Sequence, residues 1–191
     1  MRELSVSVLA VVWIAVSPPA LAKNRNYRLR SDNTVETIGD MVQMVIPLSA
    51  LAYSAAIGDG EGVWQWTEAV GSAALATQAL KYTVKEERPY EEEDSKGLTF
   101  PSGHTSFAFS GAAYWQRRYG WEIGAPMYAG AAFVAYSRVH ARKHNWFDVA
   151  AGAAIGYGFN YLFTGEYVPE GMRASLSPAD GGARFDLRMM F

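Results

Sequence analysis

Apolar residues recur through the middle of the chain at the spacing of helices, and turn residues separate the apolar runs. In one run Val70, Ala74, Leu80 and Val84 follow a near-helical spacing. The glycine-rich stretch at 58–62 marks a loop before it. We predict helices over residues 34–57, 63–85, 101–120, 125–139 and 146–163. This pattern indicates an all-α fold, a compact bundle of about five core helices.

The end of the chain follows a strand pattern instead. Residues 183–191 (ARFDLRMMF) carry aliphatic or aromatic side chains at every second position, with Arg or Asp between them. Residues 172–176 alternate in a similar way. Pro178 and Gly181–Gly182 are turn residues between the two stretches. The tail is therefore predicted to form a β-hairpin.

The first residues have the composition of a secretory signal peptide. Arg2 supplies a positive start, residues 4–16 are mostly apolar, and Ala20–Ala22 offer a small-residue cleavage site. A helix over the apolar run reaches about 20 Å, short of a hydrocarbon core of ~30 Å, so we favour a signal peptide over an uncleaved membrane anchor. We expect export to the periplasm or cell envelope. The predicted segments are a signal peptide at 1–22, an exposed lead-in at 23–33, a helical domain at 34–165 and a tail at 166–191.

Composition narrows the classes of function. The chain has no cysteine, which excludes a thiolate nucleophile, a disulfide framework and a Cys-based zinc site. Its net charge of −2 gives no global basic field, so we do not expect a nucleic-acid partner. The mean hydropathy of −0.06 favours a compact soluble bundle over a polytopic membrane protein. Residues 41–57 and 146–163 nevertheless approach the length of a membrane span, which leaves association with a membrane surface open.

The three histidines of the chain, His104, His140 and His144, gather in one part of the sequence. His144 and Asp148 stand four residues apart at the start of a predicted helix and so share one face. A carboxylate there can hold one ring nitrogen protonated and leave the other as a nucleophile. A structural His–Asp bond explains the pair alone equally well. We interpret His140 as a structural or pocket-rim residue.

Positively charged residues accompany this pair. Lys81 and Arg88 are two helical turns apart, and Arg138 precedes His144 by six residues. Phosphoryl transfer spreads negative charge over several oxygens, so catalysis relies on positioning and on cations aimed at one point. Each cation taken singly is equally well explained as a solvated surface charge.

The segment Pro101-Ser102-Gly103-His104 adds a third element. Ser102 is a suitable N-cap, and Gly103 lets a backbone amide approach an oxyanion closely. A helix N-terminus attracts phosphate. His104, one position further on, can protonate a leaving oxygen.

Three segments of this chain resemble the signature motifs of the type-2 phosphatidic-acid phosphatase family, which is related to vanadium haloperoxidases and bacterial acid phosphatases. They are KYTVKEERP at 81–89, PSGH at 101–104 and SRVHARKHNWFD at 137–148. Every fixed position of the family pattern is matched. The resemblance implies the helical fold of the acid phosphatases and haloperoxidases, and a phosphatase that needs neither a metal nor a cofactor.

The resemblance also implies roles for the matched residues. His144 would attack phosphorus and become a phosphohistidine, and Asp148 would orient it. His104 would protonate the leaving group and then activate water. The phosphate oxygens would be bound by Lys81, Arg88, Ser102, Gly103 and Arg138.

Four functions remain open at this point. We favour hydrolysis of lipid phosphate monoesters or diphosphates, because of the family and its apolar helices. A soluble periplasmic acid phosphatase for small esters is the main alternative. A vanadate-dependent peroxidase would use a similar pocket, and an inert envelope protein would retain the pocket without using it.

Overall fold

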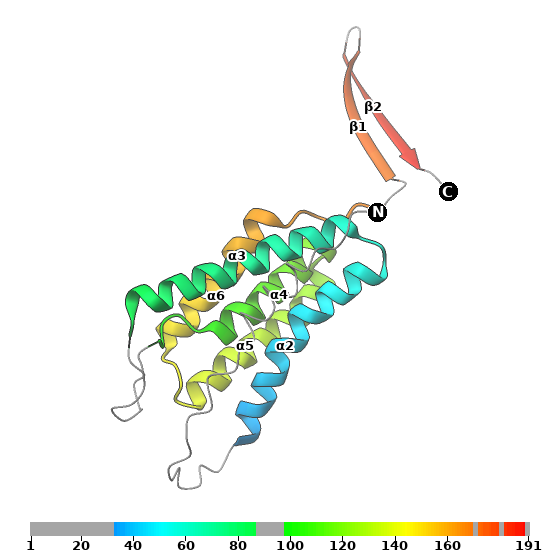
Figure 1. Ribbon diagram of the computed structural model, residues 1–191. Helices are drawn as coiled ribbons and strands as arrows, with labels where there is room; N and C mark the ends of the chain where they lie inside the picture. The colour runs from blue at the N-terminus through cyan, green and yellow to red at the C-terminus, as the bar shows by residue number, and fades with distance from the viewer. Residues whose placement is uncertain (1–32, 87–97, 170–171, 180–181, 190–191) are drawn as a thin grey trace.

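The computed structural model describes residues 33–86, 98–169, 172–179 and 182–189. Within these residues it contains five helices arranged as an elongated bundle (Figure 1). The helices are α2 (Asn33–Ala56), α3 (Gly60–Val84), α4 (Gly103–Tyr119), α5 (Trp121–His140) and α6 (Trp146–Phe163). Helix α4 is central, because it packs against each of the other four. The predicted all-α bundle is confirmed.

Two helix starts differ from the prediction by three or more residues. Helix α3 begins at Gly60, inside the stretch predicted as a loop, because the Asp59 side chain accepts a hydrogen bond from the Gly62 amide at 2.9 Å and caps the helix. Helix α5 begins at Trp121 rather than Ala125. Pro126 therefore lies beyond the first turn, where its missing N–H costs one helical hydrogen bond.

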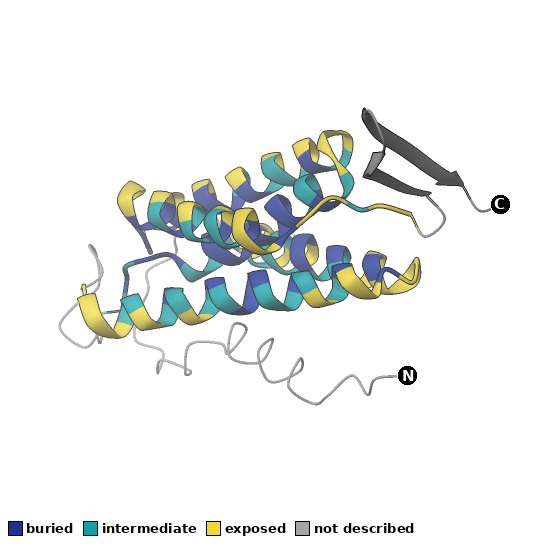
Figure 2. Ribbon diagram, turned by 90° about the horizontal axis from the view of Figure 1, so that it is seen from above, coloured by how far each residue is buried: buried dark blue, intermediate teal, exposed yellow. Residues whose placement is uncertain are grey.

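The core consists of small and aromatic side chains gathered around α4. Buried positions follow the inner faces of the helices, and exposed positions their outer faces (Figure 2). Two tryptophans join α3 and α4 to α2: the indole of Trp66 donates to the carbonyl of Pro47 at 2.9 Å, and that of Trp115 donates to the carbonyl of Ile46 at 3.2 Å. The core cluster contains Ile46, Ala50, Trp66, Val70, Phe107, Ala108, Ala112, Tyr114, Trp115, Ala131 and Val134.

Helices α4 and α6 approach each other so closely that only glycine fits between them. A Cβ atom on Gly152 would lie 2.5 Å from the Ser102 carbonyl oxygen, and one on Gly156 would lie 2.4 Å from the Ser106 carbonyl oxygen. The two glycines stand one turn apart, a spacing that brings helix backbones together. This contact fixes the start of α6 against the start of α4.

A buried ion pair ties the opposite end of the bundle. Arg118 donates to both carboxylate oxygens of Asp59, at 2.8 and 2.5 Å, and Tyr119 donates to the same carboxylate at 2.8 Å. Arg118 also donates to the carbonyls of Gly165 and Glu166, which follow α6. Both charged side chains of the pair are 3% exposed, so their interaction is shielded from water.

The tail forms the predicted hairpin, drawn at one end of the bundle in Figure 1. Strands β1 (Met172–Ala179) and β2 (Gly182–Met189) pair antiparallel, with Met172 opposite Met189. The prediction that Pro178 and Gly182 belong to the turn is wrong, since Pro178 lies in β1 opposite Ala183 and Gly182 lies in β2 opposite Ala179. Both strands of a two-stranded sheet are edge strands, where proline is tolerated.

One described helix is long and apolar enough to cross a membrane by length and composition, namely α2 over Thr34–Ala56, and 22% of its apolar 18-residue window is buried in the bundle. The predicted signal peptide at 1–22 and most of the predicted lead-in at 23–33 lie outside the described residues, as does Arg88.

Candidate active site

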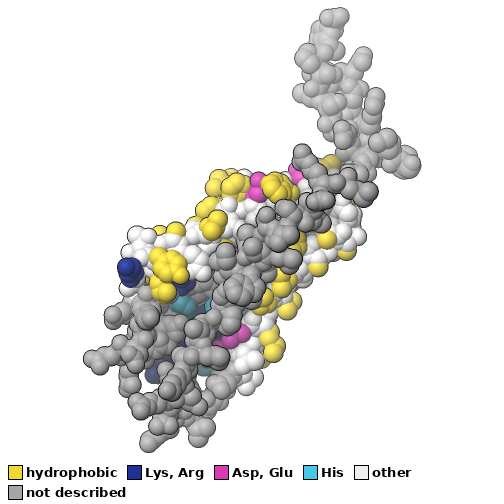
Figure 3. Space-filling view, in the orientation of Figure 1, with side chains coloured by type: hydrophobic (Ala, Val, Ile, Leu, Met, Phe, Trp, Pro, Cys, Tyr) yellow, Lys and Arg dark blue, Asp and Glu magenta, His cyan; other side chains and the backbone are white. Residues whose placement is uncertain are grey.

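The predicted site residues meet at one end of the bundle, where α3 and α5 end and α2, α4 and α6 begin (Figure 1). A space-filling view shows histidine, basic and acidic side chains close together at this end (Figure 3). Of the eight residues predicted from the sequence, seven are described; Arg88 is the exception.

The pair of His144 and Asp148 lies at the entry of α6. The Nδ1 atom of His144 faces the Oδ2 atom of Asp148 at 3.4 Å, which is long for a hydrogen bond but within the range of an ion pair. His144 is 7% exposed and the Asp148 side chain is fully buried. The contact places the Asp148 carboxylate on the Nδ1 side of the ring, and Nε2 lies on the other side.

A capping box holds Asp148 in place. The Asp148 carboxylate accepts from the Asn145 amide at 2.8 Å, and the Asn145 side chain accepts from the Asp148 amide at 2.9 Å. The Asp148 carbonyl also accepts from the Ser102 amide at 3.0 Å. The second and third sequence motifs are therefore joined through the backbone of this one aspartate.

The Ser102–Gly103 segment forms the N-terminus of α4, as predicted. The Ser102 hydroxyl caps the helix, accepting from the Thr105 hydroxyl at 3.0 Å and more distantly from its amide. Gly103 faces Lys81, because a Cβ atom at position 103 would lie 3.8 Å from the Lys81 Cε atom. A phosphate at this helix end would meet backbone N–H groups and a lysine together.

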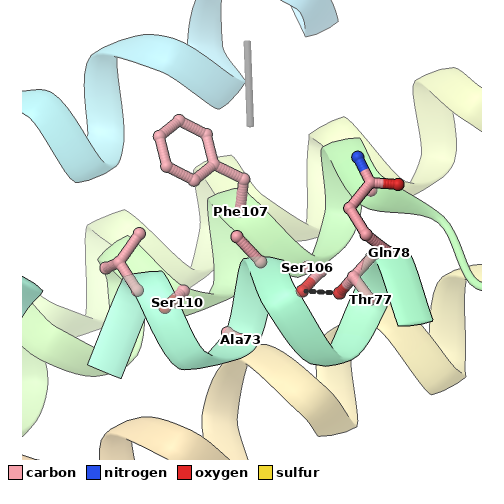
Figure 4. Close-up of a pocket in the computed structure, with 9 residues that line it drawn as sticks. Ala73, Thr77, Gln78, Ser106, Phe107 and Ser110 are labelled. Carbon is pink, nitrogen blue, oxygen red and sulfur yellow. Dashed lines mark hydrogen bonds between the residues drawn. The ribbon is translucent and has the colours of Figure 1, made fainter. Parts of the chain in front are cut away.

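Lys81 stands in the last turn of α3. Its ammonium group donates to the carbonyls of Leu98 at 2.7 Å and Thr99 at 3.4 Å, which tie it to the segment before α4. One turn earlier, Thr77 donates to the Ser106 hydroxyl at 2.9 Å and fixes α3 against α4 (Figure 4).

A cavity of about 30 Å³ lies between α3 and α4 beside Gly103 (Figure 4). Its walls combine aliphatic and aromatic groups such as Val70 and Phe107 with polar groups such as Thr77 and Gln78. This volume suits one or two water molecules rather than a lipid chain.

Arg138 is buried in the last turns of α5 and is 1% exposed. Its guanidinium donates to the Ser137 hydroxyl at 3.1 Å and to the Glu36 carbonyl at 2.8 Å. It also forms an ion pair with the Asp40 carboxylate at 2.7 Å. Helix α2 therefore holds this arginine.

His104 is in the first turn of α4, and its partner was not predicted from the sequence. The Nε2 atom of His104 lies 3.2 Å from the Oδ1 atom of Asp40 on α2. The only signal available in the sequence is a lone carboxylate just before the apolar run that begins at Met41. A single acidic residue near a helix start has several ordinary explanations, so it did not indicate a site residue.

Burial sets the protonation of both histidines. It lowers the pKa of His144 more than the Asp148 contact raises it, and the charge of Lys81 lowers it further. Burial likewise lowers the pKa of His104, against the opposing effect of Asp40 and with a further decrease from Arg138. At neutral pH His144 therefore carries a lone pair, as a nucleophile requires.

The neighbouring charged residues have other partners. His140 stacks on Tyr136, one helical turn earlier, with ring centroids 5.5 Å apart. Lys143 forms an ion pair with the Glu36 carboxylate. Across the described part of the chain, no group of three or more His, Asp or Glu side chains is arranged to hold a metal ion.

Comparisons with known proteins agree with the geometry. The family model of the PAP2 superfamily matches residues 62–166. A lipid A 4'-phosphatase of Helicobacter pylori is 34% identical over 148 residues, which cover 71% of this chain and 72% of the relative. A lipid A 1-phosphatase of Porphyromonas gingivalis is 29% identical over 143 residues, which cover 69% of this chain and 31% of the relative.

A solved structure supports the fold. The crystal structure of Aquifex aeolicus LpxE matches with a TM-score of 0.56 and 20% identity, over 85% of this chain and 96% of that one. This likeness concerns the fold alone. The family match over more than half of the chain, together with the 34% identical relative, shows that this protein belongs to the PAP2 superfamily and is a phosphoric ester hydrolase.

Proposed function

We propose that this protein removes phosphate from a phosphorylated lipid, and that its substrate is a lipid A type glycolipid phosphate. Two relatives that each match over about 70% of this chain are named lipid A phosphatases. The observation that carries the proposal is the buried His144–Asp148 pair at the entry of α6, next to Ser102 and Gly103.

In the first step, the Nε2 atom of His144 attacks phosphorus and the bond from phosphorus to the lipid oxygen breaks. The electron pair of that bond stays on the lipid oxygen, which takes a proton from His104. The Nδ1–H of His144 faces Asp148, whose carboxylate stabilises the positive charge that the ring gains. The product of this step is a phosphohistidine and a lipid alcohol.

In the second step, a water molecule attacks phosphorus from the side opposite His144. His104, now neutral, accepts the proton of that water. The phosphorus–nitrogen bond breaks, its electron pair returns to Nε2 of His144, and inorganic phosphate leaves. Both histidines then have their starting protonation states.

The charge of the transferring group is balanced by Lys81, by Arg138 and by the backbone amides at the start of α4. We expect Arg88, the arginine of the first family motif at 81–89, to join them. Such charge stabilisation is the main contribution of a protein to phosphoryl transfer.

We further propose that the protein works at a membrane of the cell envelope. Several large apolar side chains are exposed on its outer faces, among them Val45 at 63%, Leu162 at 73% and Phe147 at 82%. Phe147 adjoins the motif residue Asp148 in the sequence, so one of these exposed apolar side chains lies next to a predicted site residue. Large exposed apolar surfaces mark sites of contact with membranes or partners.

The full chain, purified in detergent, tests the substrate. Phosphate release should be measured from mixed micelles that contain lipid A bisphosphate or phosphatidic acid, and from 4-nitrophenyl phosphate in solution. We expect the highest kcat/KM with lipid A bisphosphate. The proposal is wrong in its substrate class if the soluble ester is hydrolysed with an equal or higher kcat/KM.

A matched pair of variants tests the nucleophile. His144→Ala should abolish turnover, whereas His140→Ala removes an exposed histidine at a position that the motif does not fix and should retain turnover. Rapid quenching of the wild-type enzyme with ³²P-labelled substrate should trap an acid-labile, alkali-stable phosphoprotein that His144→Ala lacks. Full turnover by His144→Ala would refute the mechanism.

A further inference from the structure

Asp40 of α2 is placed beside two residues of the proposed mechanism by a close approach of helices. A Cβ atom on the preceding residue, Gly39, would lie 2.1 Å from the Ser137 hydroxyl and 3.0 Å from the Arg138 guanidinium. Only glycine at position 39 allows α2 to lie this close to the end of α5. The close approach brings the Asp40 carboxylate to the site.

A single oxygen of Asp40 serves both neighbours. Its Oδ1 atom lies 2.7 Å from the Nη1 atom of Arg138 and 3.2 Å from the Nε2 atom of His104. This oxygen is buried, although the side chain as a whole is 44% exposed, and it meets both neighbours at ion-pair distance rather than in hydrogen-bond geometry. Burial raises the pKa of Asp40, but the contacts with His104 and Arg138 outweigh that effect and lower it, so the carboxylate is ionised at neutral pH.

We propose that Asp40 is a positioning residue that fixes His104 with its Nε2–H toward the carboxylate, so that the Nδ1 atom of His104 gives and takes the proton during catalysis. This inference rests on the acid–base role proposed above for His104. The two histidines would then react through opposite nitrogens. Asp148 occupies Nδ1 of His144 and leaves Nε2 for phosphorus, whereas Asp40 occupies Nε2 of His104 and leaves Nδ1 for the leaving oxygen.

Asp40 would also hold Arg138 ready for phosphate. The arginine is buried, and Ser137 and the Glu36 carbonyl accept from two of its five N–H donors. A carboxylate beside Nη1 keeps the planar guanidinium group of Arg138 in one orientation. Loss of Asp40 should therefore weaken both proton transfer and the binding of the transferring phosphate.

The kinetic test compares Asp40→Asn with wild type on two substrates, 4-nitrophenyl phosphate with a good leaving group and an alkyl phosphate with a poor one. We expect kcat for the alkyl ester to fall by about 10- to 100-fold, the range known for carboxylates that orient metal-bound histidines. The loss for the nitrophenyl ester should be smaller, because its departure needs less help from a proton. Asp40→Glu should restore part of the activity.

The pH profile separates positioning from mere support of the fold. The groups that face His104 are Asp40 on α2, Arg138 on α5, and Lys143 and His144 from the segment between α5 and α6. Of these, only Asp40 raises the pKa of His104. In Asp40→Asn the alkaline limb of kcat/KM should therefore move to lower pH. Glu61→Gln, which removes a carboxylate from the exposed start of α3, should leave the limb unchanged.

A spectroscopic test does not depend on activity. Because the chain has only three histidines, ¹⁵N-histidine labelling of the full protein in micelles should resolve each ring, with His104→Gln used for assignment. We expect neutral His104 in the Nε2–H form and neutral His144 in the Nδ1–H form.

Two results would overturn the role of Asp40 while leaving the phosphatase mechanism intact. One is an Nδ1–H form of neutral His104. The other is equal loss on both esters in Asp40→Asn with an unchanged pH profile. If the wild-type protein hydrolyses none of the phosphate esters, the proposed function fails instead. The tautomer measurement still decides whether Asp40 determines which ring nitrogen of His104 carries the proton.

Discussion

Replacing Gly152 by alanine tests whether the contact between α4 and α6 sets the geometry of the active site. The new Cβ atom would lie 2.5 Å from the Ser102 carbonyl oxygen, whereas ordinary contacts begin at 3.4 Å, so the helices must separate by about 1 Å. Ser102 is also the residue whose amide donates to the Asp148 carbonyl. The same displacement therefore moves His144 away from the start of α4.

The expected magnitudes follow from this displacement. A misplacement of ~1 Å can lower kcat/KM by about 100-fold. Overpacking costs about 1–3 kcal/mol, and alanine recovers up to ~1 kcal/mol of helix propensity over glycine. The net loss of up to about 2 kcal/mol corresponds to a decrease in Tm of up to about 8 °C for a protein of this size.

Gly158→Ala on the same helix is the matched control. No atom lies within 4 Å of a Cβ built at this position, so the substitution should retain activity and raise the free energy of unfolding by up to ~1 kcal/mol. Phosphate release and thermal unfolding, measured on both variants, check the prediction. A Gly152→Ala protein with wild-type kcat/KM and Tm would refute the reasoning.

Four further predictions concern the site and the fold. His104→Ala should slow alkyl esters more than nitrophenyl esters in steady-state assays, and equal loss would contradict its role as the acid. Burial lowers the pKa of both histidines, and the proposed reaction needs a neutral His144 and a protonated His104. We therefore expect kcat/KM to peak below about pH 6.5 and to fall above it. A rise in kcat/KM through pH 8 would refute this pairing. Asp59→Asn breaks the buried pair with Arg118 and should cost about 3–5 kcal/mol in denaturant unfolding, while Glu61→Gln should cost little. Phosphate release should persist in EDTA, and a strict requirement for added divalent ions would exclude the metal-free mechanism.

The residues that local chemistry determines were predictable from the sequence. Helix α6 has the predicted bounds, because Asn145 and Asp148 form a capping box that is visible in the sequence as residues of the right types at the right spacing. The start of α4 follows from Ser102 in the same way. The resemblance of the three motifs to those of a known phosphatase family then predicted which side chains form one site.

The residues that depend on tertiary packing were not predictable in this way. Asp40 reaches His104 and Arg138 only because Gly39 allows α2 to approach α5, and nothing local to residues 39 and 40 specifies that neighbour. Pro178 was assigned to a turn from its residue type alone, but strand pairing placed it inside β1. Local preference is a weak guide where long-range contacts decide the conformation.

The double use of the Asp148 carboxylate links chemical reactivity to local order. The same oxygen that faces His144 accepts the hydrogen bond that closes the first turn of α6. When that turn frays, the His144 ring loses its neighbouring carboxylate at the same moment. Under the proposed mechanism, an intact first turn of α6 is therefore a condition for the phosphorylation of His144.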